Sequence, residues 1–260
     1  MSNTYWQDRQ AAAQTKLTNK KIKETEEQLQ KYYIKSMKRV INDFEATYDK
    51  LVATAANGVP LTPADLYKLD KYWQMQGQLK VELEKLGDKQ NTLLSKAFER
   101  CWIDVYNSIS LPSEADFSTV SNEVVQQLIN EIWVADGKHF SQRIWDNTEK
   151  LLETLNEELV QCVVNGKSAE ELKDKLVERF GVSYSNADSL VRTETAHIQT
   201  QAARKRYEDY GITEVEVWAD KDERRCEVCG KLHQKKYPVG AAMPIPAHPN
   251  CRCCIVPVVD

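Results

Sequence analysis

The sequence is poor in residues that break helices, and it has no stretch apolar enough to cross a membrane. Its 260 residues include 9 glycines and 8 prolines, while charged residues make up 28% of the composition. Such a composition is typical of long solvated helices rather than of a β-sandwich. No apolar run approaches the roughly 20 residues that a membrane-spanning helix needs, and the first residues lack the apolar core of a signal peptide. We therefore expect a soluble protein made in a reducing cytoplasm.

The chain also lacks the basic excess of a dedicated nucleic-acid-binding protein. Lysine and arginine number 35 against 39 acidic residues, which gives a formal net charge of −4. In the part of the C-terminal region that is richest in basic residues, acidic residues such as Glu208 and Asp222 alternate with them. We interpret this part as a mixed solvated surface rather than as a DNA-binding surface. Its basic residues are Arg204, Lys205, Arg206, Arg224, Arg225, Lys235 and Lys236.

Long helices are expected in the N-terminal part of the chain. Residues 8–56 contain neither Gly nor Pro, and their apolar positions recur every three, four or seven residues, which predicts one very long amphipathic helix. A second helix is expected over 63–86, where Gly87 interrupts the pattern, and a third over 89–108. Antiparallel packing of these helices would bury their apolar side chains. The expected core residues are Tyr67, Trp73, Leu79, Leu83, Leu93, Phe98 and Trp102.

Helical patterns continue through the middle of the chain. Apolar periodicity predicts a helix over 121–133 and a longer one that continues through Leu159. The next helix is expected to begin at a capping box, Ser168-Ala-Glu-Glu171, and to end at Gly181. A last helix is then expected from about Ala187, ending before Gly211.

The pattern changes to strands near the C-terminus. Residues 213–219 alternate apolar and polar side chains, and 253–259 form a β-branched run suited to pairing with them. We therefore expect a mainly α fold with a small α+β C-terminal module, in which a short β-ribbon brackets a loop rich in Cys and His. The expected division is a long helical arm over 1–110, a helical middle region over 111–185 and the C-terminal module over 186–260.

The stretch from Cys226 to Cys254 holds five of the seven cysteines and two of the four histidines. Two pairs, Cys226/Cys229 and His248/Cys251, have the spacing that a tetrahedral structural zinc site needs. Cys253 is an alternative fourth ligand, and Cys254 could also compete. His233 is expected to be a solvent-facing loop residue rather than a ligand.

Other interpretations of these residues stay open. A disulfide framework is disfavoured by the odd number of cysteines, and a redox Cys-x-x-Cys normally opens a helix, whereas a Gly follows here at once. A metal-dependent nuclease would use His248 or His233 beside a catalytic ion, together with Asp220 or Asp222. Four good ligands would close the coordination sphere, which disfavours this interpretation because a catalytic zinc keeps an open position.

The last long helix carries the sequence Arg192-Thr193-Glu194. Two charged residues that are two positions apart do not share one face of a helix, so Arg192 and Glu194 are expected to meet different partners. His197 lies one turn further and is expected to be structural.

Taken together, these motifs resemble a known family. Their order and spacing in the C-terminal third of the chain are similar to those of the phage Mu F-like minor head proteins, also called phage head morphogenesis proteins. The N-terminal Tyr5-Trp6-x-x-Arg9 and the long helices resemble minor capsid proteins of tailed phages of Gram-positive hosts. The C-terminal motifs are Arg192-Thr-Glu194, Tyr207-x-x-Tyr210-Gly211, Trp218-x-Asp220-x-Asp222, Cys226-x-x-Cys229 and His248-Pro-x-Cys251-Arg-Cys253.

The resemblance implies a structural protein rather than an enzyme, made in the host cytoplasm and present in few copies inside the procapsid or virion. It implies association with the portal, scaffold or major capsid protein, no membrane, and in some members contact with DNA. Some relatives carry an appended toxin or transferase domain, and we expect none after the last motif here. The resemblance also implies a structural role for the motif residues Arg192, Glu194, Trp218, Asp220, Cys226, Cys229, His248, Cys251 and Cys253.

Overall fold

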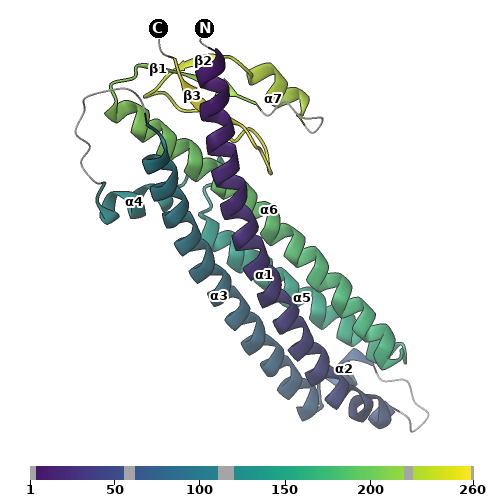
Figure 1. Cartoon of the computed structure of the whole chain (residues 1–260). Helices are drawn as coiled ribbons and strands as arrows, with labels where there is room; N and C mark the ends of the chain where they lie inside the picture. The colour runs from purple at the N-terminus through teal and green to yellow at the C-terminus, as the bar shows by residue number, and fades with distance from the viewer. Residues whose placement is uncertain (1–3, 56–61, 111–119, 220–224, 259–260) are drawn as a thin grey trace. The chain divides into compact units, whose positions relative to one another are not determined.

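A computed structural model describes residues 4–55, 62–110, 120–219 and 225–258 (Figure 1). No helix in these ranges combines the length and the apolar character that crossing a bilayer requires. The described residues form long helices followed by a small sheet, which confirms the expected fold class. The elements are α1 (Thr4–Ala55), α2 (Pro63–Leu66), α3 (Asp70–Ser108), α4 (Asn122–Ile129), α5 (Phe140–Val164), α6 (Ala169–Asp209), β1 (Glu214–Trp218), α7 (Glu227–Leu232), β2 (Lys236–Pro238) and β3 (Cys254–Pro257).

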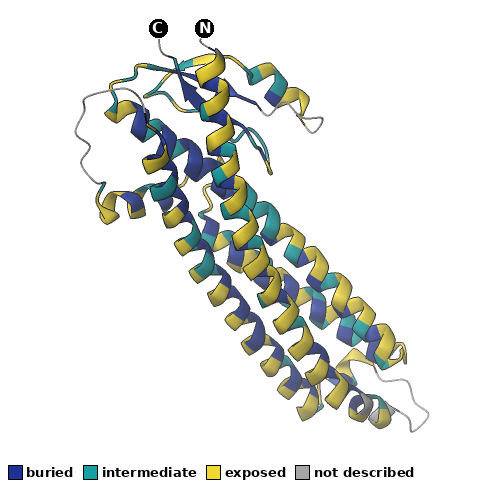
Figure 2. Ribbon diagram, viewed as in Figure 1, coloured by how far each residue is buried: buried dark blue, intermediate teal, exposed yellow. Residues whose placement is uncertain are grey.

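The chain groups into two compact units, and α1, α3 and α6 each contribute to both. Unit 1 contains Met1–Glu26, Leu93–His139 and Ser189–Asp260, and unit 2 contains Glu27–Thr92 and Phe140–Asp188. In each unit the helices bury one stripe and expose the other, as Figure 2 shows. The expected division into three consecutive segments stays a prediction.

Unit 1 contains the sheet, whose strand order is β2-β1-β3 with both pairs antiparallel. The alternating residues expected over 213–219 form the central strand β1, and Val217 of this strand pairs with Ile255 of β3. The sequence pattern did not predict β2, which has three residues and ends in a proline. The expected ribbon is therefore a three-stranded sheet, and the Cys/His loop lies between β1 and β3 along the chain.

In unit 1, α1 covers the sheet mainly with polar side chains. The amide of Gln14 donates to the Tyr207 hydroxyl at 2.9 Å and to the Ile255 carbonyl of β3 at 3.2 Å. Ala11 packs with Trp218 in a small apolar cluster. The buried residues of α1 in this unit are Gln7, Ala11, Gln14, Thr18 and Thr25.

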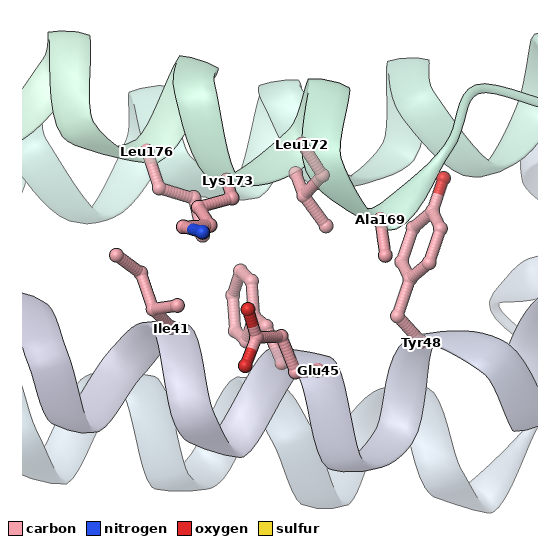
Figure 3. A pocket seen from close by; sticks show the side chains of 8 residues that line it. Ile41, Glu45, Tyr48, Ala169, Leu172, Lys173 and Leu176 are labelled. Carbon is pink, nitrogen blue, oxygen red and sulfur yellow. The ribbon is translucent and has the colours of Figure 1, made fainter.

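In unit 2, α1 buries apolar side chains instead. Figure 3 shows Ile41 of α1 opposite Leu176 of α6 and Tyr48 of α1 beside Ala169, and the hollow that these residues line has no room for a water molecule. One buried polar group in this core, the Tyr33 hydroxyl, has hydrogen-bond partners. The Tyr33 hydroxyl lies 3.1 Å from Ser183 Oγ and accepts from the Asn147 amide at 3.1 Å, and burial raises its pKa to about 12.

Gly87 does not interrupt a helix, so the expected break between 63–86 and 89–108 is wrong. α3 is continuous from Asp70 to Ser108. A Cβ atom at Gly87 would lie 2.6 Å from a ring carbon of Trp145, so the glycine admits the indole of α5 against the α3 backbone. The glycine makes room for a tertiary contact and does not end a helix.

Gly87→Ala is therefore expected to destabilise the protein, although alanine is the better helix former. Moving the Trp145 ring should cost about 1–3 kcal/mol, which exceeds the gain of about 1 kcal/mol in helix propensity. Gly77→Ala in the same helix is the matched control, because nothing lies within 4 Å of its added Cβ, and it should be stabilising. Urea unfolding of both variants measures the two effects, and shifts of the same sign would contradict the explanation.

The helix end expected at Gly181 and the helix start expected at about Ala187 are also wrong. Gly181 does not end a helix, since α6 runs from Ala169 to Asp209, and Phe180, Ser183 and Ala187 continue its buried stripe across the glycine. Packing on both sides of Gly181 outweighs the cost of about 1 kcal/mol for a helical glycine.

Two aromatic residues at the start of the second expected helix are exposed, so the expectation that they lie in the core is wrong. Tyr67 and Trp73 are 46% and 58% exposed, while Tyr72 is buried. The helix that was expected to run from 63 is broken after Leu66 and resumes at Asp70, so the apolar period changes phase at this point. The Trp73 indole instead donates to the Tyr67 carbonyl at 2.8 Å.

Candidate metal centre

The first pair of candidate ligands lies at the beginning of α7. Cys226 is the N-cap of this short helix, and its sulfur accepts from the backbone N–H of Cys229 at 3.3 Å. The capping geometry turns both sulfurs to the same side. The motif therefore does open a helix, so the expectation that its position disfavours a redox Cys-x-x-Cys is wrong. The choice between a redox site and a metal site depends instead on the imidazole and the thiols that lie near the two sulfurs.

The second pair is carried by a tight turn. The N–H of Cys251 donates to the His248 carbonyl at 3.2 Å, Pro249 follows His248, and Asn250 has a φ of 61°. A proline at the second position and a left-handed residue at the third are the pattern of a type II turn. Because the turn brings its first and fourth residues together, His248 and Cys251 lie on the same side of the loop.

The two pairs meet in two groups that share Cys229. The first group is Cys226, Cys229 and His248, and the second is Cys229, Cys251 and Cys253, with the ligand atoms of each group within 4.8 Å of one another. His248 Nε2 lies 3.2 Å from Cys226 Sγ and 3.1 Å from Cys229 Sγ. The sulfurs of Cys229 and Cys251 are 3.7 Å apart.

These distances fit a bound metal ion. Two thiolates at about 2.3 Å from a tetrahedral zinc are roughly 3.8 Å apart, which matches the Cys229–Cys251 separation. The distances from His248 are a few tenths of an ångström shorter than the roughly 3.6 Å expected between sulfur and nitrogen on one ion. Sulfur and imidazole donors suit soft or borderline cations, so the groups can hold a transition metal.

The thiols differ in how readily they ionise. The Cys229 N–H lowers the pKa of Cys226, and a hydrogen bond from the Cys253 thiol lowers the pKa of Cys251 to about 5. Burial raises the pKa of Cys229 to about 12. The thiols of Cys226 and Cys251 therefore ionise more readily than that of the shared Cys229, and a cation would favour ionisation of all three.

His248 is held in the tautomer that metal binding requires. Its Nδ1–H donates to the Pro249 carbonyl at 2.7 Å, and this hydrogen bond is the largest cause of its raised pKa. The bond leaves Nε2 free on the side of Cys226 and Cys229. Such a second hydrogen bond is the usual way in which a ligating histidine is oriented.

Each residue of the Arg192-Thr193-Glu194 motif meets a different partner in unit 1, as expected for the two charged residues. Arg192 pairs with Glu26 of α1 at 2.5 Å, and Glu194 accepts from the Trp133 indole at 2.9 Å. The sequence pattern gave no sign of a role for the middle residue. The Thr193 hydroxyl accepts the backbone N–H of Asn250, inside the ligand turn, at 3.0 Å.

His197 is buried against the same partner as Glu194. Its ring stacks on Trp133 with centroids 4.3 Å apart and an interplanar angle of 7°. Burial, assisted by the charge of Arg204, lowers its pKa to about 4. His197 is therefore neutral in the folded protein at neutral pH.

Acid should destabilise the protein through this residue. Between the unfolded pKa of about 6.5 and the folded value of about 4, the unfolded chain binds a proton that the folded one does not, so stability falls as pH falls, by about 3 kcal/mol in total. His197→Phe keeps the stacking and removes the titration. Urea unfolding at pH 7 and pH 4 should show a smaller loss in the variant, and equal losses would contradict the assignment.

The remaining candidate residues lie outside the two groups. His233 is half-buried and its Nδ1 accepts from the Ala219 N–H at 3.2 Å, so the expectation of a solvent-facing residue is wrong. Cys254 belongs to neither group within the described ranges and packs in the core beside Trp218, which removes it as a competing ligand. Asp220 and Asp222 lie outside the described residues.

Three of the basic residues of the C-terminal part contact acidic or aromatic side chains. Arg204 and Lys205 face Glu208 and Asp209 one turn later. Arg206 is buried, with its guanidinium 4.7 Å from the Tyr106 ring centroid. The contacts of Arg204 and Lys205 agree with a mixed solvated surface, whereas the buried Arg206 does not belong to it.

Comparison with known proteins finds a family match for the segment that contains the site. Residues 153–256 match the family described as "Phage Mu protein F like protein", which confirms the resemblance carried by the ordered motifs. The chain is also similar to "NAD(+)--arginine ADP-ribosyltransferase EFV" of Enterococcus faecalis (strain ATCC 700802 / V583), with 26% identity over 161 residues. That match covers 54% of this chain and 32% of the relative, so the chain spans about a third of that protein. No solved structure matches the chain.

Proposed function

We propose that this chain, with its Phage Mu protein F like segment, is a minor head protein of a tailed bacteriophage that acts in head morphogenesis. The match of residues 153–256 to the family carries the proposal. The matched segment contains the Arg192-Thr193-Glu194 motif and both groups of candidate ligands. The part of the chain with the most specific chemistry is therefore the part that the family shares.

The metal centre proposed for this protein is a structural zinc site. Its ligands are Cys226, Cys229, His248 and Cys251, with Cys253 as the alternative to one of them. Zinc suits a set of thiolates and an imidazole, and four protein ligands leave no open position for catalysis. When bound, the ion would tie the ligand loop to a sheet whose strands have five, three and four residues. Such short strands are marginal without a further constraint.

The partners proposed are the portal, scaffold or major capsid protein, inside the procapsid and later the virion, with packaged DNA as a further contact. In this proposal residues 1–110 act as a helical binding arm, 111–185 as a helical connector, and 186–260 as a rigid docking module. This proposal is motivated by a long helical region that is joined to a small module with enough ligands to surround an ion. Replacing the exposed Trp6 and Trp73 of the arm by alanine, which leaves its buried packing in place, should weaken association with the portal, and unchanged association would contradict this division of roles.

The proposed role is structural rather than enzymatic. The activity in the name of the Enterococcus relative belongs to that protein, of which this chain spans about a third. A metal-dependent nuclease is the alternative. Incubation with plasmid DNA and divalent cations separates the two, because cleavage that disappears in His248→Ala while the fold is retained would favour the enzyme.

Quantitative mass spectrometry of purified heads and virions tests the proposed function. Particles made with and without the gene are compared, and those that package DNA are counted. We expect a low copy number per particle, with fewer or malformed heads when the gene is absent. Normal heads and absence of the protein from every particle would overturn the assignment.

A further inference from the structure

The turn that carries His248 and Cys251 is held at its central peptide. The carbonyl of this peptide, from Pro249, accepts from His248 Nδ1–H at 2.7 Å. Its N–H, from Asn250, donates to the Thr193 hydroxyl at 3.0 Å. Type I and type II turns differ mainly in the orientation of the central peptide, so these two hydrogen bonds act on the group that decides the turn type.

The Thr193 hydroxyl is itself fixed by α6. It donates to the Ser189 carbonyl at 2.7 Å and accepts from Asn250, so both of its hydrogen-bonding functions are used. The neighbouring residues of the motif hold α6 on either side, through Arg192 to Glu26 and through Glu194 to Trp133. The hydroxyl therefore presents a fixed acceptor to the segment 239–253, which contains no regular secondary structure.

The orientation of the central peptide bears directly on the ligand atoms. If the Pro249–Asn250 peptide rotated, its carbonyl would leave His248 Nδ1–H and its N–H would leave Thr193. His248 would then lose the hydrogen bond that selects its tautomer and directs Nε2 toward Cys226 and Cys229. Asn250 has a positive φ, which costs free energy for a residue other than glycine and needs support from its surroundings.

We propose that Thr193 is a positioning residue for the metal centre, acting through the Asn250 amide on the geometry of His248 and Cys251. This inference rests on the metal centre of the proposed function. It gives the middle residue of the Arg192-Thr193-Glu194 motif a role distinct from those of its neighbours. An outer hydrogen bond of this kind typically accounts for about 10- to 100-fold in metal affinity.

Thr193→Val and Thr193→Ser test the proposal. Valine keeps the shape and removes the hydroxyl, whereas serine keeps the hydroxyl. Thr200→Val is the matched control, because Thr200 lies on the same helix and its hydroxyl donates to the Ala196 carbonyl at 2.9 Å, as Thr193 does to Ser189. All variants are made in the full chain, and thermal unfolding followed by circular dichroism reports their global stability.

Titration with Co²⁺, followed by displacement with Zn²⁺, gives the affinity and the visible d–d spectrum of the site. We expect Thr193→Val to bind about 10- to 100-fold more weakly, with an altered d–d spectrum, and Thr193→Ser and Thr200→Val to resemble the wild type. Equal affinity and spectrum in Thr193→Val and the wild type would overturn the role of Thr193 and leave the metal centre standing. A wild-type chain that binds neither ion would overturn the metal centre, and this proposal with it.

Discussion

Cys229→Ser is expected to abolish metal binding and to unfold the sheet of unit 1. Cys229 is the thiol common to both groups of candidate ligands, so its loss leaves neither group complete. Cys226→Ser should have a smaller effect, because Cys229, Cys251 and Cys253 remain together. The loss of affinity in Cys229→Ser should exceed the roughly 10- to 100-fold that loss of an outer-shell partner costs. Metal analysis of protein purified without chelator should find about one zinc per wild-type chain.

The unfolding should be local. Hydrogen exchange of the β1 and β3 amides should accelerate in Cys229→Ser, and in the wild type after chelation, while the core of unit 2 stays protected. Cys254→Ala is the control, because this buried cysteine lies outside both groups in the described part of the chain. It should keep its metal despite a small loss of packing. A protected sheet in metal-free protein would contradict a structural role for the ion.

The long helices could be predicted because their signal is local. An apolar period of 3.6 and the lack of Gly and Pro are sufficient for α1, and the prediction is confirmed over nearly its whole length. The errors fall where a distant residue decides the outcome. Gly87 lies inside a helix, where it makes room for the Trp145 ring, and no pattern around residue 87 contains that information.

The candidate site shows the same difference between local patterns, which could be predicted, and distant contacts, which could not. Spacing alone indicated Cys226, Cys229, His248 and Cys251, because two ligands that are three positions apart can share one turn. Spacing could not remove Cys254, whose direction depends on the strand that begins there, nor find Thr193, whose contact with Asn250 joins α6 to the ligand loop. The turn chemistry of His248-Pro-Asn-Cys was readable in principle, since Pro followed by Asn favours a type II turn.

The amides of α1 are expected to exchange much faster in unit 1 than in unit 2, although both stretches belong to one continuous helix. In unit 1 the buried residues are Gln7, Ala11, Gln14, Thr18 and Thr25, whereas in unit 2 most are large and apolar. Each fully buried large apolar side chain contributes about 1.5–3 kcal/mol, and a hydrogen bond contributes a net of about 1 kcal/mol. The apolar set in unit 2 is Leu29, Tyr33, Val40, Ile41, Phe44, Tyr48 and Leu51.

We therefore expect protection factors over 7–25 to be at least about 100-fold lower than over 29–51, equivalent to about 3 kcal/mol in the free energy of opening. Hydrogen exchange read by mass spectrometry measures this gradient. Uniform protection along α1 would mean that the helix opens only with the whole protein, and would contradict the expectation.

Thr18→Val sharpens this test. The Thr18 hydroxyl is buried without a hydrogen-bond partner among the described residues, whereas the Thr25 hydroxyl donates to the Lys21 carbonyl at 2.8 Å. Removing the unpaired hydroxyl should raise the free energy of opening over 7–25 by about 1 kcal/mol, and exchange should slow accordingly. Threonine and valine have similar helix propensities, so the effect comes from the loss of the buried polar atom. Thr25→Val removes a hydroxyl that is already paired, so it should leave exchange unchanged or faster. Equal slowing in Thr25→Val and Thr18→Val would show that hydrophobicity alone, rather than the unpaired group, limits the stability of this part of α1.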